Sequence, residues 1–186
     1  MLKKALVFLA DGFEEVEAAT PVDYLRRARI KVTTVSVGGN KTVTGAHGLP
    51  IIADSLITEL PAGAVWDILV CPGGMPGASN IAASASACAL LKAQAAAGRW
   101  VAAICASPAV VLSPLGLLRD RRAVCFPGME DKTGGACWVA DSVAIDGNII
   151  TSRGPGTAGL FAVAIIRMAV NREEADKVAA SVLLAE

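Results

Sequence analysis

Short apolar runs alternate with amphipathic or alanine-rich stretches along the chain. KALVFLA, IKVTTVSV, WDILVC and WVAAIC are rich in aliphatic and β-branched residues, and this composition predicts four buried strands. Between them, the amphipathic pattern of residues 13–28 and the alanine-rich stretch 77–97, which ends at Gly98, predict helices. The first half of the chain therefore alternates between the two kinds of element.

The second half continues the alternation. VTGAHGLPIIAD has the glycines and proline of a hairpin, and NIITSRGPGT predicts a further strand with a glycine-rich exit. A helix is expected at 106–113, and two closing helices near 157–170 and 172–184. Together these elements predict an α/β fold with a mostly parallel sheet and helices on both faces. In such folds ligands bind at the carboxyl ends of the strands.

Composition narrows the class of protein. The length of 186 residues fits one domain, and a net charge of zero does not suggest nucleic acid or an anionic membrane as a partner. Charged residues, glycine or proline interrupt the apolar runs before the ~20 residues that span a bilayer. MLKKALVFLADGFEE begins like a signal peptide, but its acidic residues favour a first strand. No transmembrane segment is therefore expected.

The cysteines and the histidine constrain the chemistry. Five cysteines without a CxxC pair argue against a disulfide framework or a metal knuckle, and they favour a reducing cytosol. A single histidine, His47, argues against a histidine-based metal site. We interpret Cys71, Cys88 and Cys137 as structural, and Cys125 as structural or as part of a pocket wall.

Cys105 lies where the predicted strand WVAAIC meets a small-residue helix. A nucleophile at this corner points out of the sheet, and the start of the helix favours its thiolate, so we expect a lowered pKa. Ala106 and Ser107 leave room for a sharp turn, as in a nucleophile elbow. The alternative is that Cys105 only fills space in the core, as buried free cysteines often do.

Two further stretches could complete a site around Cys105. Gly73 and Gly74 follow another buried strand, so the N–H groups of Gly74 and Ala106 could form an oxyanion hole. The partner of the thiol could be His47 or a carboxyl group. Glu17 stands out because its neighbours are apolar and Pro21 leaves its carbonyl without a helical N–H partner. A buried Glu17 would stay protonated and donate to a thiolate.

Four motifs in order, ALVFLADGFEEVEA, CPGGMPGASN, VAAICASPA and TSRGPGT, resemble the ThiJ/PfpI superfamily in its Parkinsonism-associated deglycase branch. The resemblance covers essentially the whole chain and implies one domain over 1–186. It also implies a flavodoxin-like three-layer αβα sandwich with a nucleophile elbow, usually a homodimer. In that branch a protonated glutamate, here Glu17, bonds the cysteine, here Cys105. The oxyanion-hole positions match Gly74 and Ala106.

The chain departs from the family pattern at two places. Phe126 stands where many members have a histidine near the cysteine, so a His–Cys dyad is absent at that position. His47 and Arg27 match two arginines that line a pocket near the dimer contact in relatives. His47 could therefore shuttle protons there, or it could be an ordinary surface or interface residue.

The resemblance implies a cofactor-free enzyme of the glyoxalase III or deglycase type, a hydro-lyase or hydrolase without metal. Its substrates would be methylglyoxal-like α-oxoaldehydes or their glycated adducts. The alternative is a cysteine redox sensor or protective stress protein with little turnover. An intracellular cysteine protease is a third possibility, which Phe126 disfavours. SRGPGT could hold a phosphate, but it lacks the lysine of a P-loop, so we expect it to shape the rim of the crevice.

Overall fold

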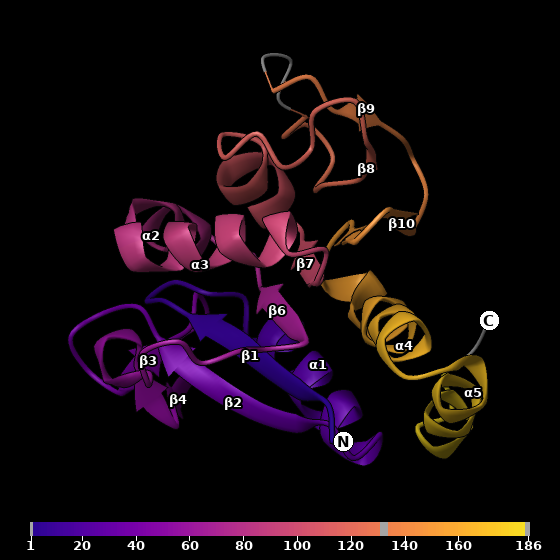
Figure 1. Ribbon diagram of the computed structural model, residues 1–186, viewed down its shortest axis with the longest axis horizontal. Helices are drawn as coiled ribbons and strands as arrows, with labels where there is room; N and C mark the ends of the chain where they lie inside the picture. The colour runs from indigo at the N-terminus through magenta and orange to yellow at the C-terminus, as the bar shows by residue number, and fades with distance from the viewer. Residues whose placement is uncertain (1, 131–133, 185–186) are drawn as a thin grey trace.

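The computed structural model describes residues 2–130 and 134–184. Its centre is a seven-stranded sheet with the order β10-β11-β7-β6-β1-β2-β5 (Figure 1). The bounds of these strands are β1 Lys4–Leu9, β2 Lys31–Ser36, β5 Ser55–Leu56, β6 Ile68–Cys71, β7 Trp100–Ile104, β10 Val143–Asp146 and β11 Ile149–Ser152. All neighbouring pairs in this sheet are parallel except β10 with β11.

Helices cover both faces of the sheet. Figure 1 shows α2 and α3 on one side and α1, α4 and α5 on the other. Their bounds are α1 Glu15–Arg27, α2 Gly77–Ala83, α3 Ala85–Ala96, α4 Ala158–Ala169 and α5 Arg172–Ser181. Short helical turns lie at η1 Ile57–Glu59, η2 Pro108–Leu112 and η3 Pro155–Thr157. The predicted three-layer αβα sandwich with a mostly parallel sheet is confirmed.

Two small sheets lie outside the central one. The antiparallel pair β3 Thr42–Thr44 and β4 Pro50–Ile52 forms the hairpin that the glycines of VTGAHGLPIIAD predict. A parallel pair, β8 Arg122–Ala123 and β9 Cys137–Trp138, follows the segment after η2. The short β8 and β9 carry no apolar periodicity, so the sequence did not predict them.

The central strands are buried because helices cover the sheet on both sides. Every residue of β6 and β11 is buried, and so is every residue of β1 after Lys4. Continuous apolar runs are typical of parallel strands in this position. The carboxyl ends of β1, β6 and β7 are therefore held in fixed positions relative to one another, and the residues of interest follow directly after them.

Two predicted helices differ from the structure. The single helix expected over 77–97 is divided at Ser84, whose side-chain oxygen accepts the N–H of Ala87 at 3.3 Å and begins α3. This local capping competes with a continuous helix. The helix expected at 106–113 contains the short π-helical segment η2, in which the N–H of Ser113 donates to the carbonyl of Pro108 at 2.9 Å.

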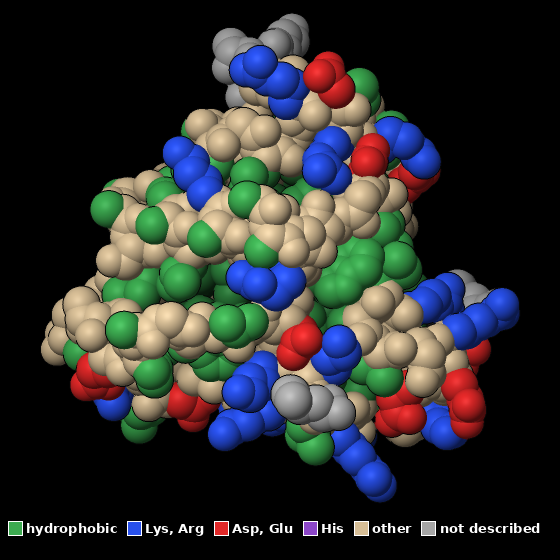
Figure 2. Space-filling model, in the orientation of Figure 1, with side chains coloured by type: hydrophobic (Ala, Val, Ile, Leu, Met, Phe, Trp, Pro, Cys, Tyr) green, Lys and Arg blue, Asp and Glu red, His purple; other side chains and the backbone are tan. Residues whose placement is uncertain are grey.

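Acidic and basic side chains are interspersed along the lower edge of the face shown in Figure 2, and apolar side chains line the grooves between the helices. Among the residues that the structure describes, no helix combines the length and the apolar character needed to cross a membrane.

Candidate active site

Cys105 occupies a sharp turn directly after β7. Its φ of 63° lies in the left-handed region that residues other than glycine rarely adopt. Its backbone is bonded on both sides, since its N–H donates to the carbonyl of Ser152 at 2.9 Å and its carbonyl accepts from Phe126 at 2.8 Å. The residue is 9% exposed. The structure thus places Cys105 on the corner that the sequence predicts, mostly but not completely enclosed.

The glycine turn after β6 lies beside this corner. A Cβ at Gly73 would stand 2.6 Å from the Cβ of Cys105 and 2.7 Å from Glu17 Oε2, so no larger residue fits there. The N–H of Gly73 donates to Glu17 Oε2 at 2.8 Å. The backbone N–H groups of Gly74 and Ala106 hydrogen-bond to Cys105. The four positions expected to meet, Glu17, Gly74, Cys105 and Ala106, do so.

Glu17 reaches this turn from the first part of α1 and is fully buried. The helix continues through Pro21, although a proline leaves the carbonyl four residues earlier without its usual donor. One carboxyl oxygen accepts from Gly73, and the other, Oε1, is buried without a hydrogen-bond partner among the described residues. This oxygen is free to hold a proton or to accept a group from a bound molecule.

The Glu17 carboxyl has an unusual pKa. Burial raises it from 4.5 to about 7, while hydrogen bonds from Gly73 and Cys105 work in the opposite direction. The charge of Glu14 adds to the rise. A carboxyl with a pKa near neutrality can both donate and accept a proton under physiological conditions.

The pKa of Cys105 is raised to about 12, first by burial and then by the negative charge of an ionised Glu17. The N–H groups of Gly74 and Ala106 lower it, but by less. The prediction of a lowered pKa for Cys105 is therefore wrong. It considered the helix that follows Cys105 but did not include the burial of the thiol. That helix contributes little here, since η2 spans only Pro108–Leu112.

The two groups titrate as a pair. Two negative charges in contact oppose each other, so the pair loses its first proton near neutral pH and its second only at high pH. Moving the remaining proton from sulfur to Glu17 places the single negative charge on sulfur and turns the carboxyl into a donor to the thiolate. The nucleophile is thus generated by proton transfer within the pair, without loss of its last proton to solvent.

Ser107 ties the elbow to the glycine turn, a role that the sequence did not reveal. Its buried hydroxyl donates to the carbonyl of Pro72. The carbonyl of Gly73 in turn accepts the N–H of Glu14 at 3.0 Å. These bonds fix the turn between α1 and the elbow, and with it the direction of the Gly74 N–H.

A hollow of ≈ 340 Å³ opens next to the elbow, lined by Phe126, Pro127, Ser142 and residues 153–157. Phe126 is 45% exposed, and its ring would lie 3.3 Å from a Cβ on Gly154. The same Cβ position is 4.0 Å from Glu17 Oε1. The apolar ring at this position offers no base to the thiol.

His47 and Arg27 lie away from the elbow within one chain. His47 Nδ1 is 2.9 Å from Glu15 Oε2, and its side chain is 72% exposed. Arg27 pairs with Asp23 at 2.8 Å along α1. Neither lines the hollow beside Phe126. Their placement in a pocket near a dimer contact therefore stays a prediction.

The contact of His47 with Glu15 joins the β3–β4 turn to α1. Burial of Glu15 opposes its ionisation. Hydrogen bonds to its carboxylate from the His47 ring and from the backbone N–H groups of Glu15, His47 and Leu49 outweigh burial and lower the pKa of Glu15 to about 2. The same contact, followed by the charge of Glu14, raises the pKa of His47. Glu14, Glu15 and His47 also offer metal-ligand atoms within 4.8 Å of one another. Because the imidazole already satisfies Glu15, we assign no metal to this group.

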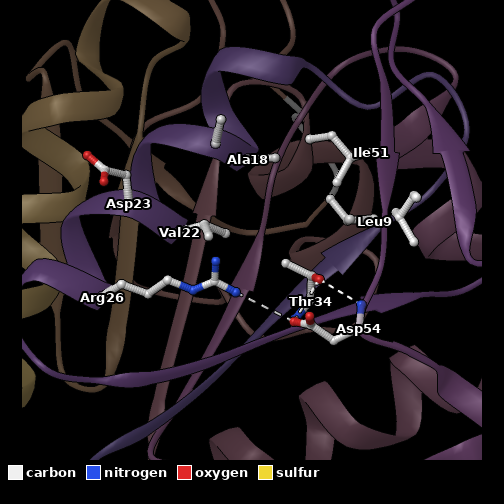
Figure 3. Close-up of a pocket in the computed structure, with 10 residues that line it drawn as sticks. Leu9, Ala18, Val22, Asp23, Arg26, Thr34, Ile51 and Asp54 are labelled. Atoms are coloured by element: carbon white, nitrogen blue, oxygen red, sulfur yellow. Dashed lines mark hydrogen bonds and ion pairs between the residues drawn. The ribbon is translucent and has the colours of Figure 1, made fainter.

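A second hollow, of ≈ 310 Å³, lies between α1, β2 and the β3–β4 hairpin (Figure 3). In Figure 3, Arg26 extends toward Asp54, which lies 3.6 Å from it and also accepts from Thr34. Ala18 and Ile51 form part of its apolar wall. It contains neither Cys105 nor Glu17, so it is separate from the site at the elbow.

The other cysteines follow the structural interpretation, with one exception. Cys71 is buried in β6, and burial raises its pKa; Cys88 is partly buried and donates to the carbonyl of Ala82. Cys125 lines a hollow of ≈ 250 Å³ with Glu130 and Arg153, as a pocket wall would. The exception is Cys137, which is exposed.

Comparisons with known proteins match most of the chain to one family. The model of the DJ-1/PfpI family matches residues 3–168. Protein DJ-1 homolog B of Arabidopsis thaliana is 40% identical over 169 residues, 91% of this chain. The glutathione-independent glyoxalase DJR-1.2 of Caenorhabditis elegans is 33% identical over 187 residues, covering 99% of this chain and 98% of that protein. The structure of oxidized Toxoplasma gondii DJ-1 has a TM-score of 0.93 at 38% identity, covering 99% and 100% of the two chains.

The relatives differ in length. This chain spans 38% of Arabidopsis homolog B and 47% of Arabidopsis homolog A.

Proposed function

The chain belongs to the DJ-1/PfpI family, and we propose that it is a cofactor-free enzyme of the glyoxalase type that acts on methylglyoxal-like α-oxoaldehydes. The observation that carries the proposal is the contact of the Glu17 carboxyl, with a pKa of about 7, with Cys105 on a left-handed turn. A relative named as a glutathione-independent glyoxalase supports it. Glycated adducts of the same aldehydes would enter through the same first step.

The reaction begins with addition. The thiolate of Cys105 forms a bond to the aldehyde carbon, and the electron pair of the C=O bond moves to oxygen. The N–H groups of Gly74 and Ala106 stabilise this oxyanion. Glu17 then gives its proton to the oxygen, which yields a neutral hemithioacetal and leaves the carboxylate.

The carboxylate next acts as a base. It takes the hydrogen from the former aldehyde carbon as a proton and returns it to the neighbouring carbon, while the hydroxyl proton moves between the two oxygens. The first carbon is oxidised to a thioester and the second is reduced to an alcohol, so no outside oxidant is needed. Water then cleaves the C–S bond, releasing a 2-hydroxy acid and the thiol.

The direct test is lactate formation from methylglyoxal by pure protein without glutathione. Cys105→Ala is expected to abolish it. Glu17→Gln, which keeps the acceptor for Gly73 but cannot exchange a proton, is expected to lower kcat by about 10²-fold or more. Lactate formation that persists in Cys105→Ala would contradict the assignment of the nucleophile.

A second candidate function is a redox sensor. Cys105 thiolate would attack peroxide, with the O–O bond breaking to give a sulfenate and water, and a second peroxide would give the sulfinate. The proton on Glu17 would bond the sulfinate oxygen, and the solved structure of oxidized Toxoplasma gondii DJ-1 supports this candidate function. Intact mass after mild peroxide distinguishes the two functions. Addition of two oxygen atoms at Cys105 without lactate formation favours the sensor, and an unchanged mass contradicts it.

A cysteine protease is the least supported function. Cleaving a peptide requires a proton for a poor leaving amine, and Phe126 stands where many relatives have a histidine. We expect no cleavage of unfolded casein even at high protein concentration, and cleavage that depends on Cys105 would reverse this conclusion.

We also propose that the protein is a cytoplasmic homodimer that uses small reactive carbonyl compounds as substrates, without nucleic acid or membrane as partners. The face formed by α1 and the β3–β4 hairpin supports the dimer, since Val16, Leu49 and Ile52 are 47%, 57% and 75% exposed on it. Light scattering of wild type and Ile52→Glu tests it. A monomeric wild type would contradict the proposal.

A further inference from the structure

Arg153 is the charged residue of the hollow beside the elbow. It is half-buried, and among the eight residues that line this hollow no other carries a charge. It also lines the neighbouring hollow with Cys125 and Glu130. Arg153 therefore lies between the two cavities, and its Nη1 donates to the carbonyl of Ala140, a residue of the second hollow.

The backbone connects this hollow to the nucleophile. The carbonyl of Ser152, the residue before Arg153, accepts the N–H of Cys105 at 2.9 Å. On the other side, the N–H of Phe126 donates to the carbonyl of Cys105 at 2.8 Å. One lining residue, Phe126, is thus bonded directly to Cys105, and another, Arg153, directly follows a residue that is.

Among the residues that the structure describes, no acidic side chain forms an ion pair with the Arg153 guanidinium. Its one hydrogen bond in the described part of the chain goes from Nη1 to the carbonyl of Ala140 at 3.2 Å. Of the nearby acids, Asp141 pairs with Arg122 at 2.9 Å, and Glu130 Oε2 accepts from the N–H of Gly128 at 2.9 Å. A guanidinium has five N–H donors, so Arg153 keeps a fork available for a carboxylate or phosphate.

We propose that Arg153 binds an anionic oxyacid group of the substrate, so that the site favours reactive carbonyl compounds carrying a carboxylate or phosphate over neutral ones. The carbonyl group would face Cys105, and the anionic end would lie in the hollow lined by Phe126 and residues 153–157. The proposal rests on the proposed function, in that Cys105 receives the substrate. It adds the class of substrate that the site prefers.

Two alkylating reagents of similar size test this without any turnover. Iodoacetate and iodoacetamide modify a thiolate by the same displacement, but only iodoacetate carries a carboxylate. The rate of modification is measured for each by mass spectrometry of the peptide containing Cys105, which excludes the exposed Cys137. In Arg153→Ala, the iodoacetate-to-iodoacetamide rate ratio is expected to fall by roughly threefold to tenfold.

Matched variants separate binding from general charge effects. Arg153→Lys keeps the charge, so the ratio is expected to fall less. Arg119→Ala removes an equal charge from an exposed position that does not line the hollow, and it should leave the ratio unchanged. An unchanged ratio in Arg153→Ala, or an equal fall in Arg119→Ala, would overturn the proposal.

The wild-type protein provides a test that does not depend on how a variant folds. Acetate or inorganic phosphate is expected to slow alkylation by iodoacetamide at matched ionic strength, whereas acetamide should not. Stronger protection by phosphate than by acetate would identify a phosphate ester as the preferred substrate, and the reverse a carboxylate. Equal rates with acetate, phosphate and acetamide would overturn the proposal. Failure to form lactate would instead count against the enzyme function alone.

Discussion

The Glu17 carboxyl and the Cys105 thiol hold each other in unusual protonation states, although they come from opposite halves of the chain. Burial raises the pKa of both, to about 7 and about 12, and the hydrogen bond between them couples the two titrations. A buried pair that retains one proton over a wide range of pH can generate a thiolate and an acid in the same step.

The first prediction concerns the reactivity of Cys105 toward iodoacetamide. In the wild type the rate should rise with an apparent pKa near 7, since the pair loses its first proton there, and then stay level. In Glu17→Gln the rise near pH 7 should disappear, because no carboxyl group remains to titrate. Peptide-level rates from pH 5 to pH 10 check this, and an unchanged profile in the variant would disprove the coupling.

The second prediction concerns stability. Glu17 has a folded-state pKa of about 7, raised from 4.5, so its contribution is fully present below pH 4.5 and is lost as the pH rises through 7. The loss amounts to about 3 kcal/mol at 1.36 kcal/mol per pKa unit. The free energy of unfolding of Glu17→Gln, relative to that of wild type, should therefore increase by about this much as the pH rises from 4.5 to 8. Urea unfolding at both pH values measures it, and a parallel pH dependence of the two proteins contradicts it.

The third prediction concerns the glycine turn. Gly73→Ala would place a Cβ 2.9 Å from the carbonyl oxygen of Ile104 and even closer to Cys105 and Glu17. Because backbone cannot yield as a side chain can, we expect a loss of about 1–3 kcal/mol in the free energy of unfolding, with slower alkylation of Cys105. Gly39→Ala, where a Cβ meets nothing within 4 Å, is the control. Equal stability of the two variants would show that the turn has room.

The fourth prediction assigns Ser107 a positioning role. Ser107→Ala removes the bond to the Pro72 carbonyl and leaves that buried acceptor unsatisfied, at a cost of about 1–3 kcal/mol. The apparent pKa of Cys105 alkylation should also shift, because the Gly74 N–H is no longer held toward the sulfur. Ser107→Thr restores the hydroxyl and should recover the profile. If Ser107→Ala loses stability but keeps the wild-type pH profile, the serine is structural only.

The fifth prediction concerns the β3–β4 turn. Glu15→Gln weakens the bonds from His47 and Leu49 to a charged carboxylate, so we expect a loss of about 1–3 kcal/mol at pH 6. Glu15 has a lowered pKa, so its contribution is present above pH 4.5 and is lost as the pH falls toward about 2. Thermal unfolding from pH 3 to pH 7 should show wild type and variant converging at low pH. A constant difference would contradict the role of the charge.

The sequence by itself determined the architecture and most of the candidate site. Apolar runs at 4–10, 66–71 and 100–105 predicted three central strands, and their alternation with helical stretches predicted the mostly parallel sheet. The strands β5 and β10 were not predicted. The glycines after β6 and the small residues around Cys105 marked the two turns, because close backbone approach excludes larger side chains. Glu17 was identifiable from its apolar neighbours.

Only the tertiary structure decided how these groups affect one another. The burial that raises the pKa of Cys105 comes from α1 and the glycine turn packing over it, and no local pattern around residue 105 reveals that. The bond from Ser107 to Pro72 and the position of Arg153 beside Phe126 likewise depend on segments far apart in the chain. Periodicity records which side of an element is buried, whereas electrostatics depends on what the fold brings within a few ångströms.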